Sequence, residues 1–527
     1  MTRFSLAVLL GRAAIIATLL VPVFATYASA QFGAPPTPTS QANALPLSGR
    51  NTQGGVVTSE SPVPSTTTSV NTLNPTVSVQ GAYSGSARST AQLPFSGKLS
   101  LAEAIQRGLQ YNLGAVGMTQ AVRQARGQAR AARSALLPNI KADVNDTEET
   151  FNLRSIGFNF SIPGGFTLPA VVGPFNVLDM RARLSQTIAD FTALNNYRSA
   201  REVARAGELS AKDAQDLVVL GVAGAYLQVL AAKARLDSAH AQLDTANALY
   251  QRTTQQLKFG RAALIDVNRS QVEVLLDQQR LATLQNDLAK QKINLARLTG
   301  LPPIADYELS NDIPYAPAPP LSLEEAVQQA LGQRADLKAA ENQVRAAERA
   351  LAAARAERLP SASASLDYGD IGPPSKLRPT YTISATLNVP IWNGGRTGAD
   401  IQQAQAALAQ RRAELEDTRS QIESEVRSAY LDLEAASNQV RVAQQNIALM
   451  GETLHQTRQR FEAGVSENIE VVQSQESVAG ANLDYIDSVF AHNLAKLALA
   501  RALGNAANKL AQFLPVQQHV GAVTGYK

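Results

Sequence analysis

Apolar and polar residues alternate with a period of two in four short segments of the chain. In the clearest segment, residues 381–389, every odd position is apolar and every even position is polar. The same period is present in residues 140–145, 178–185 and 361–368. We predict four β-strands of about nine or ten residues, a length that crosses a bilayer when the strands are tilted. A half-buried sheet of a soluble protein would alternate in the same way, so the pattern alone leaves both kinds of sheet open.

Two proline-free stretches, residues 192–258 and 396–462, follow the two pairs of strands and predict long helices. Each helix would be about 100 Å long at 1.5 Å per residue, and globular domains rarely contain such a helix. Apolar residues recur every seven positions in these stretches, at Leu236, Leu243, Tyr250 and Leu257 and at Val440, Ile447, Leu454 and Phe461. This spacing predicts coiled-coil packing against neighbouring helices.

A glycine follows each long stretch, Gly260 in the first case and Gly464 in the second. Glycine permits the positive φ that a tight reversal of a helix can require. We therefore expect the chain to turn back at these tips into return helices over residues 264–299 and 468–510.

The body of the chain is a duplication. Residues 99–104 recur as residues 321–326, which is 222 positions further along, whereas residues 225–300 recur without gaps after only 204 positions. The difference indicates an insertion of 18 residues in the first copy. We expect it within residues 151–176, between the two strands of that copy, where phenylalanine, proline and glycine are frequent.

Each copy begins with a Ser-x-x-Glu capping box, formed by Ser100 with Glu103 and by Ser322 with Glu325. We expect the helices that start there to continue up to Pro138 and Pro360, because proline cannot continue a helix.

The composition agrees with long helices rather than with compact mixed cores. Aromatic residues are 5% of the chain and hydrophobic residues 45%, so much of the apolar content is Ala, Leu and Val. The formal net charge is +4, and it falls to +2 without Arg3 and Arg12, which we expect to be removed with the N-terminus. Such a small charge does not predict a nucleic-acid partner.

The sequence contains no candidate for catalysis, metal binding or cofactor binding. With no cysteine in the chain, disulfides, thiolate metal sites, cysteine nucleophiles and a lipid-modified N-terminal cysteine are excluded. The four histidines are scattered and none belongs to a metal-binding pair. No motif joins a nucleophile to a base, so we expect a protein that is not an enzyme.

The N-terminus predicts export. Residues 1–30 read as a signal peptide, with an uncleaved membrane anchor as the alternative. Residues 31–97 are rich in Pro, Ser and Thr and predict a flexible or extended leader. We assign the first copy to residues 98–300, a connector to 301–320, the second copy to 321–510 and a C-terminal tail to 511–527.

The order of capping helix, strand pair, long helix, tip glycine and return helix, repeated once, resembles the TolC-type outer membrane efflux protein family, also called outer membrane factors. Residues 387–396 (LNVPIWNGGR) are similar to the family's strand-to-helix junction, whereas the first copy has no glycine pair there. The resemblance covers about residues 99–510. It implies a mostly α protein with a small membrane β-barrel part, closed by trimerisation, and long coiled-coil helices that form a tunnel.

The number of strands by itself also requires several chains. Four strands cannot close a barrel, and open sheet edges cannot face lipid. The resemblance implies that three copies share one barrel in the outer membrane, while their helices extend into the periplasm. It also implies two partners, a periplasmic adaptor protein and an inner-membrane transporter.

The resemblance places a periplasmic gate just past the second tip, at the positions of Glu470 and Gln473. Asp266 lies six residues after its glycine, as Glu470 does, and is a further candidate for the gate. The alternative is that Asp266 and Glu470 are solvated carboxylates favoured by the helix dipole.

The tips themselves are the expected docking surface for the adaptor. The candidate residues are Lys258, Gly260, Arg261, Phe461, Gly464, Val465 and Ser466.

We therefore predict an outer membrane conduit for efflux, and a trimeric coiled-coil adhesion protein of the cell surface remains the alternative. Drugs, metal ions, small metabolites and, in type I secretion, unfolded polypeptides are all cargoes of the resembled family. No residue pattern selects among them, although only four methionines are present and they form no cluster of the kind that a soft metal favours.

Overall fold

The computed structural model describes residues 56–64, 71–87, 95–155, 169–303, 306–312, 315–463, 465–504, 506–514 and 517–518. The expected signal peptide, the tip glycine Gly464 and residues 519–527 of the expected tail lie outside the described residues.

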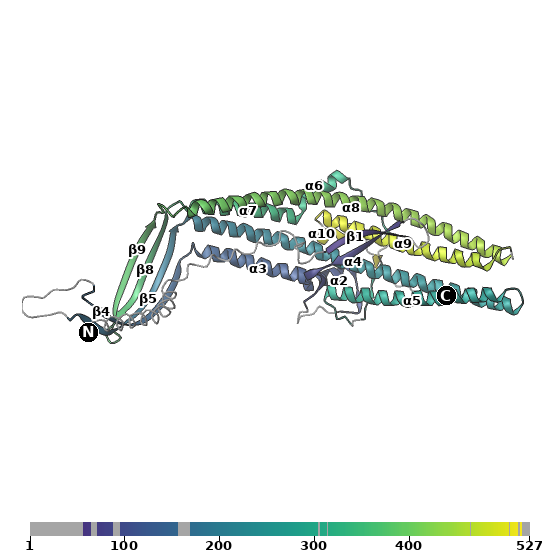
Figure 1. Cartoon of the computed structure of the whole chain (residues 1–527), viewed down its shortest axis with the longest axis horizontal. Coiled ribbons are helices and arrows are strands. Elements are labelled where there is room, and N and C mark those ends of the chain that lie inside the picture. Colours follow the sequence, from purple (N-terminus) through teal and green to yellow (C-terminus); the bar gives the residue numbers. More distant parts are fainter. Residues whose placement is uncertain are drawn as a thin grey trace, which may run out of the picture. The chain divides into compact units, whose positions relative to one another are not determined.

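The four expected strands are present and form one antiparallel sheet (Figure 1), although at 11 to 19 residues they are longer than the nine or ten residues expected. They are β4 (Asn139–Asn152), β5 (Val171–Ala189), β8 (Ser361–Gly372) and β9 (Arg378–Asn388), paired in the order β4-β5-β8-β9. Residues 373–377 connect β8 to β9, whereas residues 153–170 connect β4 to β5. The longer connection thus belongs to the first copy, between the two strands where the insertion was expected.

The sheet has an apolar face, which is exposed within the chain, and a polar face, which is partly exposed. Large side chains on the apolar face are exposed by 62–76%: Ile140, Val144, Tyr368, Tyr381, Ile383 and Leu387. The opposite face carries hydroxyl and charged groups, such as Ser365 and Ser384, whose oxygens lie 3.1 Å apart. A broad exposed apolar surface of this kind indicates contact with lipid or with another apolar surface.

Each copy contains one long helix and its return helix. They are α4 (Phe191–Lys258) with α5 (Leu264–Thr299), and α8 (Arg396–Glu462) with α9 (Asn468–Ala502). The second return helix was expected to continue to Leu510, but it stops at Ala502. Gly504 adopts φ of +73°, which ends the helix, and α10 (Ala506–Phe513) begins beyond it.

The seven-residue rows are only partly buried within one chain. Val440 is fully buried, but the expected row of α4 is half-buried, and the buried row lies three positions away at Ala239, Ala246 and Thr253. Small side chains at these positions let neighbouring helices approach closely.

The helix α4 also contains an 18-residue window that is apolar enough to cross a membrane. However, 78% of this window is buried inside the protein, where it forms part of the core.

The capping helices of both copies are broken, which corrects the expectation of continuous helices. The first copy has α2 (Leu101–Tyr111) and α3 (Leu113–Ser134), and the second has α6 (Leu323–Gln333) and α7 (Ala335–Ala356). The breaks fall at Asn112 and Arg334, which are equivalent in the two copies and share an extended backbone with ψ near 131°.

The two helix starts differ in their caps. Ser322 and Glu325 form the complete expected capping box. Ser100 accepts a hydrogen bond from the Glu103 N–H, but the Glu103 carboxylate accepts one from Arg107 at 3.0 Å. The first copy therefore keeps half of its predicted box.

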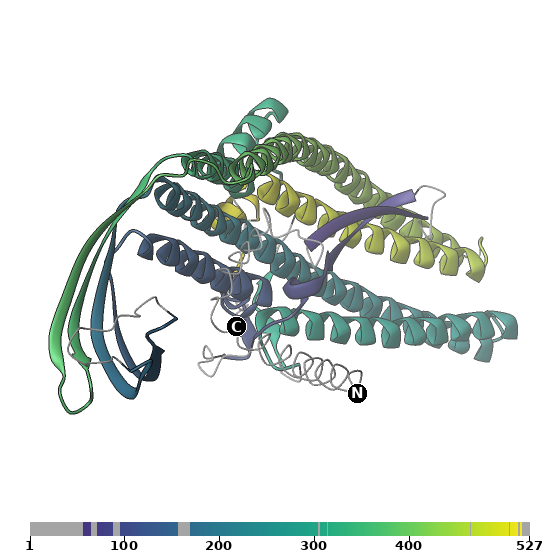
Figure 2. The ribbon, with the colours of Figure 1, turned by 60° about the vertical axis from the view of Figure 1, so that its left-hand side comes forward.

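Where the structure describes the leader, which was expected to be flexible or extended, the chain forms extended strands. It contains β1 (Val56–Pro64) and β2 (Asn71–Val79), an antiparallel pair that lies across α4 (Figure 2), followed by the short helix η1 (Gly81–Ser84). A Cβ on Gly221 of α4 would lie 3.3 Å from Val56, and one on Gly224 would lie 2.7 Å from Val77. Glycines in α4 thus leave room for the strand pair, a tertiary fit that local composition does not predict.

The leader also fills the break in the first capping helix. Leu113 N–H donates to Gly85 C=O at 2.9 Å, and Ala87 N–H donates to Tyr111 C=O at 2.7 Å. These two hydrogen bonds make up the isolated bridge between Ser86 and Asn112. Two further short pairings link distant segments: β3 (Lys98–Leu99) with β6 (Glu308–Leu309), and β7 (Asn311–Asp312) with β10 (Gln517–Gln518). Backbone groups freed by the break are therefore satisfied by the leader.

Trp392, the only tryptophan of the chain, lies between β9 and α8 and is 87% exposed beside Ile391, which is 95% exposed. Since aromatic side chains favour the membrane–water interface, we predict that Trp392 lies at that interface. In liposomes its fluorescence will be blue-shifted and quenched by lipids brominated near the headgroup. Trp392→Phe will abolish the signal. Emission as in water, with full quenching by acrylamide, would contradict this placement.

Candidate functional site

The two tips are short reversals between a long helix and its return helix. At the first tip, Gly260 has φ of +70° and Arg261 N–H donates to Gln256 C=O at 2.8 Å. At the second tip, Val465 N–H donates to Arg460 C=O at 3.0 Å. The most exposed apolar side chains there are Phe259, at 79%, and Val465, at 67%.

The expected docking residues fall into two groups. Lys258, Arg261 and Val465 are exposed at the ends of the hairpins. Phe461 instead packs against a small cluster formed by Leu249, Val471 and Val472, together with Leu454. Because this cluster joins α4, α8 and α9, Phe461 holds the two hairpins together near their tips. Ser466 is half-buried.

Asp266 has the geometry of a helix-start carboxylate. Its Oδ2 accepts a hydrogen bond from Ala263 N–H at 3.3 Å, and Arg269 Nη1 lies 3.9 Å from Oδ1. Glu470 occupies the corresponding first turn of α9, with its side chain 43% exposed and its Oε2 3.7 Å from Arg460 Nη1. Gln473 is exposed one turn further along α9, on the same side as Glu470.

Asn468 brings the starts of the two return helices together. It is 2% exposed, and its Nδ2 donates to Asp266 C=O and to Ser270 Oγ, both at 3.3 Å. Asn468 was not among the residues predicted from the sequence. The signal was a difference between the copies, because the equivalent position in the first copy is Leu264, and a buried amide in place of leucine requires a partner.

An ion pair also joins the hairpins at the tips. Arg252 Nη1 of α4 lies 2.8 Å from Glu462 Oε1 of α8. The hydrogen bond from Arg252 holds the pKa of Glu462 below its usual range. Because both side chains are exposed by about half, the pair contributes orientation more than stability.

Between the hairpins lies a cavity of about 250 Å³ lined by polar groups of α4, α5, α8 and α9. Glu273, Asp277 and Glu476 contribute three carboxylates, and Arg280 Nη1 lies 3.3 Å from Asp277 Oδ1. Burial raises the pKa values of Glu273 and Asp277, and neighbouring carboxylates add to the shift while the Arg280 charge opposes it. The charged forms of these two carboxylates are therefore disfavoured in the cavity.

No group of three or more His, Cys, Asp or Glu side chains in the described ranges is arranged to hold a metal ion. The polar groups near the tips instead connect helices to one another, and their chemistry is that of ion pairing and hydrogen bonding.

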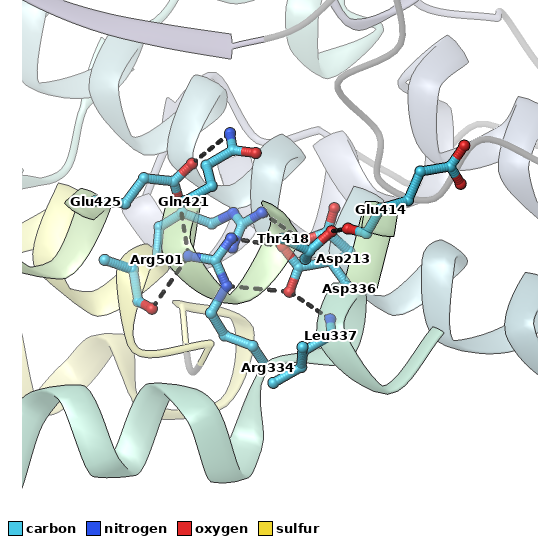
Figure 3. A network of polar contacts seen from close by, with 10 residues as sticks. Asp213, Arg334, Asp336, Leu337, Glu414, Thr418, Gln421, Glu425 and Arg501 are labelled. Atoms are coloured by element: carbon cyan, nitrogen blue, oxygen red, sulfur yellow. Dashed lines mark hydrogen bonds and ion pairs between the residues drawn. The ribbon is translucent and has the colours of Figure 1, made fainter. Parts of the chain in front are cut away.

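A second set of polar contacts is buried where the capping helices are broken (Figure 3). Arg334, 1% exposed, donates from Nε to Asp336 Oδ1 at 3.0 Å and from Nη1 to Glu425 Oε2 at 2.7 Å. Arg501, 3% exposed, donates to Asp213 of α4. The network thus joins α4, α7, α8 and α9 at the ends of the hairpins opposite their tips.

Asp216 extends these contacts to α10. Its Oδ1 accepts a hydrogen bond from Ala507 N–H at 2.8 Å. Burial raises the pKa of Asp216, while this hydrogen bond and the Arg501 charge oppose the shift. The start of α10 is therefore attached to α4 through one buried carboxylate.

Comparison with known proteins gives a consistent result. Residues 104–301 and 326–505 match the family described as outer membrane efflux protein. The pyoverdine export outer membrane protein OpmQ of Pseudomonas aeruginosa is 27% identical over 398 residues, which cover 73% of this chain and 80% of OpmQ. The outer membrane protein TolC of Vibrio cholerae is 23% identical over 392 residues, covering 71% of this chain and 83% of TolC.

Among solved structures, the outer membrane protein VceC of Vibrio cholerae is similar to this chain with a TM-score of 0.65. It is 20% identical, and the alignment covers 77% of this chain and 96% of VceC. At this identity the likeness establishes the fold.

The duplication supplies a matched test of the buried network. Arg501→Met leaves the buried Asp213 without its cation, and we predict a loss of about 3–5 kcal/mol in the free energy of unfolding. Arg297→Met changes the equivalent but exposed residue of the first copy and should have an effect within about 0.5 kcal/mol. Urea unfolding of the detergent-solubilised protein, followed by circular dichroism, measures both. Equal midpoints for the two variants would contradict a stabilising role.

Proposed function

Since this chain belongs to the outer membrane efflux protein family, we propose that three copies of it form one conduit, which receives cargo from a periplasmic adaptor and an inner-membrane pump. The protein is an outer membrane efflux channel of the TolC type, with its helical part in the periplasm. The adhesion protein that the sequence left as an alternative has no support from the family match.

One observation carries the proposal of a shared barrel. The sheet of one chain has four strands, an exposed apolar face and a partly exposed polar face. Such a sheet is stable in a bilayer only when its edges are paired, its apolar face meets lipid and its polar face lines water. Three copies supply twelve strands, which is within the range of known membrane barrels. The channel has no need of a catalytic group, so we also propose that it is not an enzyme.

The tips are the proposed docking surface for the adaptor. Phe259 and Val465 present apolar side chains at the free ends of the two hairpins, flanked by the charged groups of Lys258 and Arg261. An apolar centre with a charged rim is typical of protein–protein contacts. The leader, whose strand pair lies on α4, belongs to the opposite ends of the hairpins, and we propose that it has a structural role.

The gate is proposed at the start of α9. Glu470 from three copies would place three carboxylates at a narrow aqueous constriction, where they attract cations. The contact with Arg460 offsets part of this negative charge within each chain. Gln473 adds no charge, and the Asp266 carboxylate already accepts a hydrogen bond from Ala263 N–H at the start of α5. Charge selection therefore depends on Glu470.

The number of chains is open to direct measurement. We predict that native mass spectrometry of the detergent-solubilised protein will give a mass of three chains. The physical reason is that the edges β4 and β9 find partners only in neighbouring copies. A stable monomer that retains its strand signal in circular dichroism would contradict the shared barrel.

The gate is tested by two substitutions with opposite expected results. Glu470→Ala should lower the preference of the channel for cations and weaken block by multivalent cations, whereas Arg460→Ala should raise both, because it frees the Glu470 carboxylate. Gln473→Ala is the control without a charge change. The measurement is the reversal potential of single channels in planar bilayers under a salt gradient.

If channels with Glu470→Ala and with Arg460→Ala keep the selectivity of the parent protein, Glu470 is a surface acid and the gate lies elsewhere. Conductance of the parent protein itself tests the conduit, independently of where the gate is located.

A further inference from the structure

The polar face of the sheet carries six charged side chains close to one another, which we call the charge belt: Lys141, Asp143, Asp179, Arg181, Arg183 and Asp367. They share one face because side chains alternate along each strand and the register places them opposite one another: Lys141 faces Arg183, Asp143 faces Arg181, and Arg183 faces Asp367. In the sequence all six are polar positions of the alternating segments.

Arg183 is at the centre of the charge belt. Its Nε lies 3.5 Å from Asp143 Oδ2 on β4 and 3.3 Å from Asp367 Oδ1 on β8, so this one guanidinium bridges three strands. Lys141 Nζ lies 3.8 Å from the same Asp143 oxygen. The side chain of Arg183 is 39% exposed, which leaves it accessible to water and to solutes on this face.

Arg181 and Asp179 form the second part of the charge belt. Arg181 Nε donates to Asp179 Oδ1 at 2.6 Å, and both side chains are mostly covered. Opposite Arg181 on β8 is Gly369, where a Cβ would lie 2.8 Å from Arg181 Cγ and 2.0 Å from Met180 C=O. Glycine at this position lets the arginine lie close to the sheet.

The charge belt faces away from the apolar surface of the sheet. Ile140, Val144 and Leu366 are next to charged residues along the strands, and they project to the opposite, exposed side. In a closed membrane barrel the apolar side meets lipid and the polar side lines the lumen. The charge belt therefore belongs to the lumen wall, far along the chain from the residues of the tips.

We propose that the charge belt sets the charge preference of the barrel section of the conduit and that Arg183 is its specificity-determining residue. This inference rests on the proposed trimeric conduit. Three cations and three carboxylates balance one another in each copy, so the strand section favours neither cationic nor anionic cargo. Arg183 maintains this balance, because it is the cation that offsets Asp143 and Asp367 together.

The test removes charges one at a time from the two faces of the sheet. Arg183→Gln should raise the ratio of cation to anion permeability by about two- to five-fold at about 10 mM salt, where screening is weak. Asp367→Asn should lower the ratio. Asp370→Asn is the matched control, since it removes the same charge three residues away on β8, on the lipid side of the strand. Reversal potentials under a potassium chloride gradient measure all three.

Unchanged ratios for Arg183→Gln and Asp367→Asn, in channels that conduct, would overturn the inference and leave the conduit intact. An equal shift for Asp370→Asn and Asp367→Asn would also overturn it, because charge selection would then not depend on the lumen face. If channels with Arg183→Gln do not assemble, the permeability ratio of channels with Asp367→Asn tests the inference. Failure of the parent protein to conduct would instead overturn the proposed function.

Discussion

In the sheet of one chain, β5 and β8 have hydrogen-bonded neighbours on both sides, whereas β4 and β9 have one neighbour each among the described residues. A bilayer offers no water to satisfy the remaining backbone groups, so the two edges require strands from other copies. The apolar face with Ile383 and the polar face with Arg183 acquire their environments, lipid and lumen, only through this closure. The half-buried rows of the long helices belong to the same arrangement, because further chains supply neighbours for them.

The two copies of the duplication differ in how the breaks of their capping helices are filled. Both capping helices break at equivalent positions, Asn112 and Arg334, and both breaks free backbone groups. In the first copy the leader fills the break through Gly85 and Ala87. In the second copy, the Arg334 side chain reaches Asp336, Glu425 and the backbone of Ala502, and Gly504 leaves room for it. A duplicated framework has therefore diverged where each copy meets a different neighbouring segment.

The polar contacts of the hairpins differ between their two ends. Opposite the tips, the Arg334 and Arg501 groups are almost completely buried, and breaking such pairs costs several kcal/mol. Near the tips, the Arg252–Glu462 pair is exposed, and the carboxylates of Glu273, Asp277 and Glu476 line one cavity. Buried ion pairs thus lie where the return helices end, whereas the ion pair near the tips is exposed. This distribution is compatible with the gate proposed at the tips.

The sequence by itself determined the four strands, the bounds of α4, α5 and α8 and the two reversals, because a period of two, long proline-free stretches and tip glycines are local signals. It also indicated Asp266 and Glu470 as first-turn acids. Only the tertiary structure decided the breaks at Asn112 and Arg334, the strand pair of the leader, the role of Asn468 and the charge belt around Arg183. Each of these depends on partners far away in the sequence, whose positions are set by packing and strand register rather than by local propensity.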